Sequence, residues 1–191
     1  MLLRTFIAIE IPNEIKKQII SQTVGLRQKA ARSVRWGAPE NIHITLKFLG
    51  EISPAQVDLL LPMLKSEAAK YAPFEMTVDE LGAFPNVRRP RIIWLGLNAP
   101  SALMNLQQSL ESAVTRLGHL PDQRPYSPHL TIGRVREALS GAEMFSLQHA
   151  LEAAKVNSPG TFIVKSIHLM QSELKAAGPI YTSLSTAALG G

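Results

Sequence analysis

Cysteine is absent from the 191 residues of the chain. Its absence excludes disulfides, thiolate metal sites and a cysteine nucleophile, so any chemistry must come from His, carboxylate, hydroxyl, Lys or Arg groups. Long apolar runs are absent too. The run near the N-terminus is interrupted by Arg4, Thr5 and Glu10, and no later run reaches membrane-spanning length. We therefore expect a cytoplasmic protein with no membrane segment.

Charged residues are scarce, at 18% of the chain, whereas hydrophobic residues make up 46%. This balance disfavours disorder and supplies enough apolar material for a real core. The length lies in the usual range of one domain, and no low-complexity tract or charge run marks a linker. We expect a single domain over residues 1–191 that acts as a monomer.

The net charge of +5 and the sequence pI of about 9.7 favour polyanionic partners or acidic substrates. RNA is one such partner. Many soluble basic proteins bind nothing acidic, so the charge permits the RNA hypothesis without selecting it.

Hydrophobic periodicity predicts an interleaved series of strands and helices. The predicted helices run from Asn13 to about Lys29, from Ser53 to Tyr71, from Pro100 to Leu117 and from Glu143 to Lys155. The predicted strands are Leu3 to Ile11, Ile42 to Leu49, Phe74 to Leu81, Arg91 to Leu97, His129 to Val135, Thr161 to Met170 and Tyr181 to Ser185. Hairpins mixed with helices in this order indicate an α+β fold.

Two of these strands begin with the same pattern. The stretch PENIHITLKFLG from Pro39 resembles RPYSPHLTIGRV from Arg124, and each has a proline-bearing approach followed by His, an apolar residue and Thr. Side chains alternate between the faces of a strand, so His43 and Thr45 share one face, as do His129 and Thr131. A lone His and Thr on a strand are usually a surface pair, but two matching copies favour a site built from two related lobes.

Two histidines suit phosphodiester chemistry without a metal. One can deprotonate the attacking oxygen while the other protonates the departing oxygen, and an imidazole titrates near neutral pH. The threonine hydroxyls can donate hydrogen bonds to phosphate oxygens as negative charge grows in the transition state.

The paired HITL at His43 and HLTI at His129 resemble the signature of the two-histidine (2H) phosphoesterase superfamily. The most similar branch is that of the LigT-like RNA 2′,3′-cyclic phosphodiesterases, once called 2′-5′ RNA ligases. The resemblance extends over nearly the whole chain, including RTFIAIEIP, GAFPNVRRPRIIWLGL and SELKAAGPIYTSL.

This resemblance implies a bilobal α+β fold, with two antiparallel sheets facing a central groove and helices on the outside. It implies hydrolysis of a terminal 2′,3′-cyclic phosphate on RNA to a 2′-phosphomonoester, with no metal or other cofactor. By the same resemblance His43 is the proton donor, His129 is the proton acceptor, and Thr45 and Thr131 bind phosphate. The two histidine roles could be reversed.

Several further residues are candidates for phosphate or RNA binding. Arg134 follows the second motif, but strict alternation places it on the face opposite His129, and a bulge at Gly133 would be required. Lys47 is predicted on the same face as His43, where an exposed strand lysine is the favoured interpretation.

Arginine and aromatic residues together are typical of sites for single-stranded RNA. Arg88 and Arg89 lie near Phe84 in the turn GAFPNVRRP, although a solvated turn explains any one arginine equally well. We expect one aromatic residue among Phe48, Phe84 and Tyr126 to stack on the terminal base, and we expect Trp36 to be structural.

The remaining histidines, His119, His149 and His168, are expected to be structural or exposed, and their spacing matches no zinc ligand set. Three alternatives to the leading hypothesis stay open: an RNA-binding module without chemistry, a phosphodiesterase for a small cyclic nucleotide, and reverse ligation of RNA ends. The natural RNA, tRNA fragments being one option, is not identified by the sequence.

Overall fold

The computed structural model describes residues 1–176 and 178–190, and the parts of the predictions that fall on Ala177 and Gly191 lie outside these ranges. The helices of the described residues are α1 (Asn13–Lys29), η1 (a 3₁₀ helix, Pro39–Asn41), α2 (Pro54–Ala68), α3 (Ser101–Arg116) and α4 (Gly141–Ala153). The strands are β1 (Leu3–Glu10), β2 (Val34–Trp36), β3 (His43–Ile52), β4 (Phe74–Phe84), β5 (Ile92–Asn98), β6 (His129–Val135), β7 (Gly160–Val164), β8 (Ser166–Lys175) and β9 (Gly178–Ala188).

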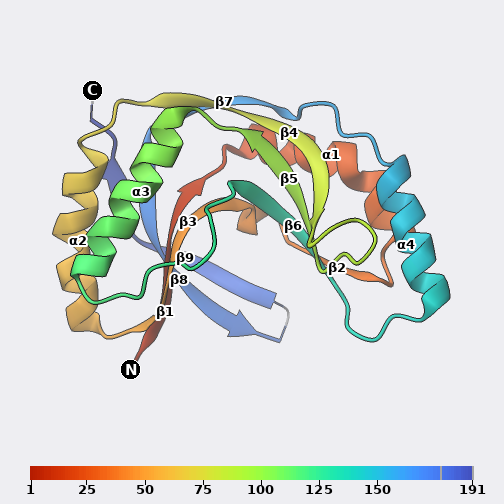
Figure 1. Cartoon of the computed structure of the whole chain (residues 1–191), viewed down its shortest axis with the longest axis horizontal. Coiled ribbons are helices and arrows are strands. Elements are labelled where there is room, and N and C mark those ends of the chain that lie inside the picture. Colours follow the sequence, from red (N-terminus) through yellow and green to blue (C-terminus); the bar gives the residue numbers. More distant parts are fainter. Residues whose placement is uncertain (177, 191) are drawn as a thin grey trace.

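The described strands form one curled antiparallel sheet in the order β7-β4-β5-β6-β3-β1-β8-β9, with β2 paired to β6 (Figure 1). This arrangement confirms the predicted α+β class. The two predicted sheets are the two halves of this sheet. Within the described residues the halves meet at β3 and β6, where the register holds one residue pair, Ile44 with Leu130.

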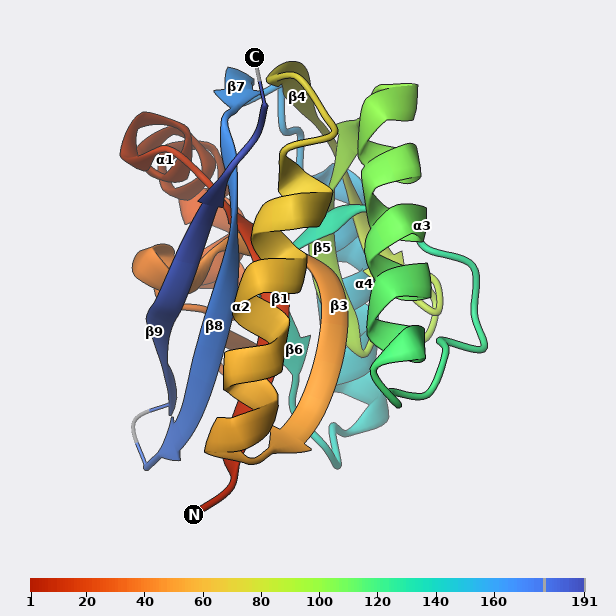
Figure 2. The same cartoon turned by 90° about the vertical axis from the view of Figure 1, so that its left-hand side faces the viewer.

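Helices cover the outside of the curl. Helices α2 and α3 lie over the half that contains β3, β8 and β9, and α1 and α4 lie over the other half (Figures 1 and 2). The main core fills the space between helices and sheet, with residues such as Ile19, Leu64, Leu110 and Leu147 meeting buried strand residues such as Ile44. The opposite face of the sheet, called the inner face below, is therefore free to carry polar groups.

Two helices begin with a capping box. Ser53 precedes α2 and Ser140 precedes α4, and each serine hydroxyl accepts a hydrogen bond from the backbone N–H three residues on. The side chain at that third position, Gln56 or Glu143, accepts one from the serine N–H in return. Such reciprocal bonds satisfy N–H groups that a helix leaves unpaired, which explains the sharp starts.

Two strand predictions need correction. Strand β2 is missing from the sequence-based set, because three residues that pair only with β6 are too short for a periodic signal. The predicted strand from Thr161 to Met170 is two strands that separate at Lys165. Strand β7 pairs with β4 at one edge of the sheet and β8 pairs with β1 in the other half, but both are rich in β-branched and apolar residues, which hides the break.

The register shifts by one residue directly after each His-x-Thr motif. In β3 the pairs with β1 are Ala8–Thr45 and Ile7–Lys47, so Leu46 is an extra residue. In β6 the pairs with β5 are Trp94–Thr131 and Ile93–Gly133, so Ile132 is an extra residue. A β-bulge of this kind moves every later side chain of the strand to the other face relative to strict alternation.

Candidate active site

His43 opens β3 and lies on the inner face. Its Nδ1 is 2.7 Å from the carbonyl oxygen of Asn41, and its Nε2 is 3.1 Å from Thr45 Oγ1. A carbonyl oxygen can only accept, so Nδ1 carries the proton and Nε2 of the neutral ring accepts from the threonine hydroxyl. The ring lies against Phe6 and Tyr181, with centroid separations of 4.8 and 5.1 Å. These contacts fix the tautomer and the orientation of His43.

His129 opens β6 and repeats the same local geometry. Its Nδ1 is 2.7 Å from the carbonyl oxygen of Ser127, again two residues before the histidine, so Nδ1 donates and Nε2 of the neutral ring carries the lone pair. The ring of Phe84 stands edge-on to His129 at a centroid separation of 5.0 Å, and Trp94 lies at 6.5 Å. One motif in each half of the sheet thus presents an imidazole held from behind by a backbone carbonyl.

The pKa of His43 lies below its ordinary value, chiefly because burial disfavours the charged ring. The hydrogen bond to Asn41 and the charge of Glu10 act in the opposite direction, whereas Lys16 and His129 lower the pKa further. Burial therefore favours the neutral form of the His43 ring in the free protein.

The two threonines occupy matching places. Thr45 pairs with Ala8, and Thr131 pairs with Trp94, one residue pair before the bulge in each case. Both side chains are half-buried on the inner face. The structure thus brings His43, Thr45, His129 and Thr131 to one face of one sheet, as the paired motifs predict.

The prediction for Lys47 is wrong. Because the extra residue Leu46 precedes it, Lys47 points into the protein rather than onto the inner face, and it is 2% exposed. Its ammonium is 2.7 Å from Glu111 Oε1 and 3.2 Å from Asp122 Oδ1, so the buried charge is paired.

Strict alternation also fails for Arg134. The strand has a bulge, as the sequence requires for Arg134 to share a face with His129, but the extra residue is Ile132 rather than Gly133. The charge of Arg134 lowers the pKa of Tyr181, although burial raises that pKa overall. This interaction places Arg134 within electrostatic reach of the other half of the sheet.

The three aromatic candidates differ in their surroundings. Phe48 is 60% exposed, and its ring lies 5.9 Å from that of Phe6 on the inner face, again because of the bulge at Leu46. Phe84 lies half-buried against His129 and Trp94. Tyr126 is largely enclosed, packs on the main core and donates from its hydroxyl to the carbonyl oxygen of Thr45, 3.2 Å away. Of the three, Phe48 offers the most open ring.

The remaining candidates lie outside this arrangement. Arg88 and Arg89 are exposed in the turn between β4 and β5, beyond Phe84. Trp36 packs on the main core, with the guanidinium of Arg27 5.0 Å from its ring centroid.

The other histidines differ in burial. His149 is exposed beside Phe145, and His119 is partly buried after α3. His168 is buried, with Ser166 Oγ and Thr186 Oγ1 each 3.1 Å from a ring nitrogen, and burial lowers its pKa. These positions agree with the expectation that the three are structural or exposed.

Sequence reasoning missed the groups that surround the two catalytic candidates. Phe6 and Tyr181 enclose His43, and Trp94 lies beside His129. The alternation of β1 could have placed Phe6 and Glu10 together, since Glu10 pairs directly with His43. The position of Tyr181 depends on how β9 returns beside β8, which no local pattern encodes.

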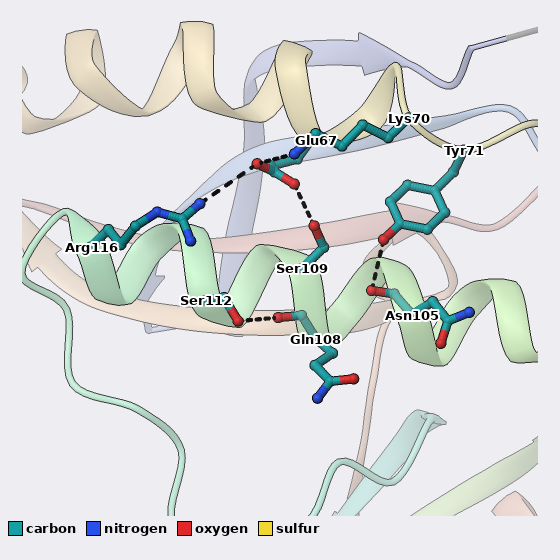
Figure 3. A pocket seen from close by; sticks show the side chains of 8 residues that line it. All are labelled: Glu67, Lys70, Tyr71, Asn105, Gln108, Ser109, Ser112 and Arg116. Atoms are coloured by element: carbon teal, nitrogen blue, oxygen red, sulfur yellow. Dashed lines mark hydrogen bonds and ion pairs between the residues drawn. The ribbon is translucent and has the colours of Figure 1, made fainter.

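A pocket of about 420 Å³ lies elsewhere, between α2 and α3 on the helical side of the sheet (Figure 3). Its centre is the buried Glu67, which accepts hydrogen bonds from Lys70 and Ser109 and lies 3.9 Å from Arg116. Burial alone would raise the pKa of Glu67, but these hydrogen bonds and charges lower it. The carboxylate is already paired, so the pocket is an ion cluster that joins two helices.

No group of three or more His, Cys, Asp or Glu residues is placed to hold a metal ion in residues 1–176 and 178–190. In the same ranges, none of the helices is both long enough and apolar enough to cross a bilayer.

Two imidazoles, one on each half of a sheet and each beside a threonine, form an arrangement that is chemically suited to paired proton transfer at a phosphate. A model of the LigT-like phosphoesterases matches the chain twice in succession, over residues 9–94 and 95–181, so that each match contains one motif. The chain belongs to this family, which confirms the predicted two-histidine resemblance.

Known relatives agree. The chain is 33% identical to an RNA 2′,3′-cyclic phosphodiesterase of Methanothermobacter thermautotrophicus over 184 residues, which cover 96% of this chain and 97% of that protein. It is 32% identical to the enzyme of the same name from Escherichia coli, covering 97% and 96% of the two chains. The crystal structure of E. coli LigT with 3′-AMP superposes with a TM-score of 0.75 at 30% identity, over the whole of both chains.

Proposed function

We propose that the protein hydrolyses a 2′,3′-cyclic phosphate at the end of an RNA chain to a 2′-phosphomonoester. The observation that carries the proposal is the repeated geometry of His43 and His129, each of which opens a strand with Nδ1 bound to the carbonyl oxygen two residues earlier and has a threonine two residues later. The names of relatives that match nearly the whole chain support the same reaction.

In the proposed reaction His129 accepts a proton from water, whose oxygen attacks the phosphorus atom. The bond between phosphorus and the 3′ oxygen breaks, and protonated His43 donates its Nε2 proton to that oxygen, so the product carries a 3′ hydroxyl and a 2′ phosphate. Thr45 and Thr131 donate hydrogen bonds to the non-bridging oxygens. The lowered pKa of His43 makes its protonated ring a stronger acid, and the bound phosphate anion favours that protonated form.

The main experiment uses an oligoribonucleotide that ends in a 2′,3′-cyclic phosphate, incubated with the protein in excess chelator. A 2′-phosphomonoester supports the proposal. Binding without conversion would indicate a non-catalytic RNA-binding module, and faster turnover of a cyclic mononucleotide would indicate a small-molecule substrate. Adding an RNA with a free 5′ hydroxyl to the assay tests reverse ligation through a 2′-5′ linkage.

A modified substrate assigns the two histidine roles. Sulfur in place of the 3′ oxygen leaves as a thiolate and needs no proton, so the variant that lacks the general acid should recover rate on this substrate. Recovery by His43→Ala, and not by His129→Ala, is the expected result. The opposite result would reverse the assignment.

The proposal includes contact of RNA with Phe48, Phe84, Arg88, Arg89, Tyr126 and Arg134. Phe48 and Arg134 have the strongest support, because both bulges bring these side chains to the inner face. The proposal also includes a monomeric enzyme, since one chain supplies both histidines. It places that enzyme in the cytoplasm. Sedimentation of the active protein tests the oligomeric state, and activity on tRNA fragments tests one class of natural substrate.

A further inference from the structure

The two histidines lie on strands that are poorly joined to each other. Within the described residues β3 and β6 share a single residue pair in register, Ile44 with Leu130. By contrast, β3 pairs with β1 over most of its length. A single pair holds two strands much less firmly than a ladder, so the placement of His129 relative to His43 must depend on other contacts.

The segment that leads to His129 is a long loop. Residues 117–128 connect α3 to β6, and nearly all of them are exposed or only partly buried. The loop ends at Ser127, whose carbonyl oxygen holds Nδ1 of His129. A loop with so little burial is expected to be mobile unless specific contacts hold it.

Lys47 supplies such contacts from the strand that carries His43. Its buried ammonium donates to the carbonyl oxygen of Leu120 at 3.0 Å and to Glu111 Oε1 at 2.7 Å, and it lies 3.2 Å from Asp122 Oδ1. Glu111 Oε1 also accepts from the backbone N–H of Asp122 at 2.8 Å. The ammonium therefore makes two hydrogen bonds and an ion pair, and two of these three partners, Leu120 and Asp122, lie in the loop.

A second tether attaches the same loop to the same strand. Tyr126, which immediately precedes Ser127, donates from its hydroxyl to the carbonyl oxygen of Thr45. The path from β3 to His129 thus runs from Lys47 and Thr45, through the loop, to the carbonyl oxygen that fixes the ring.

We propose that Lys47 is a positioning residue of the active site, which sets the place of His129 relative to His43 by holding the loop of residues 117–128. Its role rests on the proposed function, because it acts through a catalytic histidine. Lys47 does not touch the substrate, since the bulge at Leu46 turns it to the opposite side of the sheet.

The test compares Lys47→Met with Lys70→Met. Both changes remove a lysine whose ammonium is 2.7 Å from a glutamate oxygen, but Lys70 follows the end of α2 and pairs with Glu67 rather than with the loop. Lys47→Met should lower kcat for hydrolysis of the RNA cyclic phosphate about 10- to 100-fold with little change in KM, since a displacement near 1 Å costs on that order. Lys70→Met should keep the wild-type kcat.

A spectroscopic readout separates positioning from general damage. The ¹⁵N resonances of His129 report which ring nitrogen carries the proton, and they need no substrate. Wild type should show Nδ1–H, and Lys47→Met should show a mixture, because the carbonyl of Ser127 is no longer held in place. Asp122→Ala and Tyr126→Phe each cut one tether without removing the buried ammonium, so they test the idea even if Lys47→Met does not fold.

Wild-type kcat and an unchanged Nδ1–H signal in the tether variants would overturn the positioning role. If the wild-type protein does not hydrolyse the cyclic phosphate at all, the proposed function fails, but the His129 resonances still decide whether Lys47 positions that ring. The two failures are therefore distinguishable.

Discussion

Gly82 leaves room for the indole ring beside His129. A Cβ atom built at Gly82 would lie 2.3 Å from two atoms of the Trp94 ring, whereas ordinary van der Waals contact begins near 3.4 Å. In Gly82→Ala the indole must therefore move by about 1.1 Å. Trp94 in turn contacts Phe84, whose ring is packed edge-on against His129, so the displacement is transmitted to the catalytic candidate.

We expect Gly82→Ala to lower kcat/KM for the cyclic phosphate by roughly 10- to 100-fold, because misplacement near 1 Å has effects of that order. Overpacking should also destabilise the fold by about 1–3 kcal/mol, partly offset by the lower chain entropy of alanine in the unfolded state. Steady-state kinetics measure the first effect and urea unfolding the second. Near-ultraviolet circular dichroism should report the new environment of Trp94.

Gly96 provides a matched control. It lies on β5, paired with His129, and a Cβ atom there would be 3.4 Å from the same indole. Gly96→Ala should therefore retain activity within a few-fold of wild type. Equal activity in Gly82→Ala and Gly96→Ala would refute the argument that the position of Trp94 controls His129.

Further predictions concern the catalytic and buried polar groups. His43→Ala and His129→Ala should each lower the hydrolysis rate roughly 10²- to 10⁴-fold and remove one limb of a bell-shaped pH profile. The loss of rate in the double variant should be far less than the two single losses combined, while RNA binding measured by filter retention persists. Thr45→Val and Thr131→Val should slow turnover with little change in thermal midpoint, and near-normal rates in both would return them to a structural role. Because burial lowers the pKa of His43 and His168 in the folded protein, the unfolded chain binds their protons first as pH falls. The contribution of these histidines to stability should be complete above the pKa of histidine in the unfolded chain, about 6.5, and should decline below it by at most about 1.4 kcal/mol per pH unit for each histidine. His168→Gln should make that decline smaller, as measured by urea unfolding at pH 7.5 and 5.5.

The catalytic candidates could be predicted from sequence because the signal is local. A histidine and a threonine two residues apart on a strand share a face whatever the strand packs against, and the pattern occurs twice. The predicted helix start at Ser53 is local in the same way, since a capping box involves only four residues. The box at Ser140 is equally local, although the predicted helix begins three residues later, at Glu143.

The residues beyond the motifs could not be assigned to faces, because bulges depend on pairing with another strand. Nothing within HITLKF indicates that Leu46 has no partner on β1. A prediction that assumes strict alternation therefore assigns Lys47 and Phe48 to the wrong faces. The break at Lys165 is hidden for a related reason, since the partners of β7 and β8 are far apart in the sequence. Topology, rather than composition, decided these positions.

The paired bulges have a consequence for how the two halves can diverge. Phe48 and Arg134 stand five residues after their histidines and are each the first inner-face side chain beyond the extra residue. Equivalent positions in the two halves of the sheet therefore hold a flat apolar ring in one half and a planar cation in the other. A nucleotide presents two kinds of surface, an aromatic base and an anionic backbone. The double exchange Phe48→Arg with Arg134→Phe would test whether these two positions alone determine the direction in which RNA lies across the sheet.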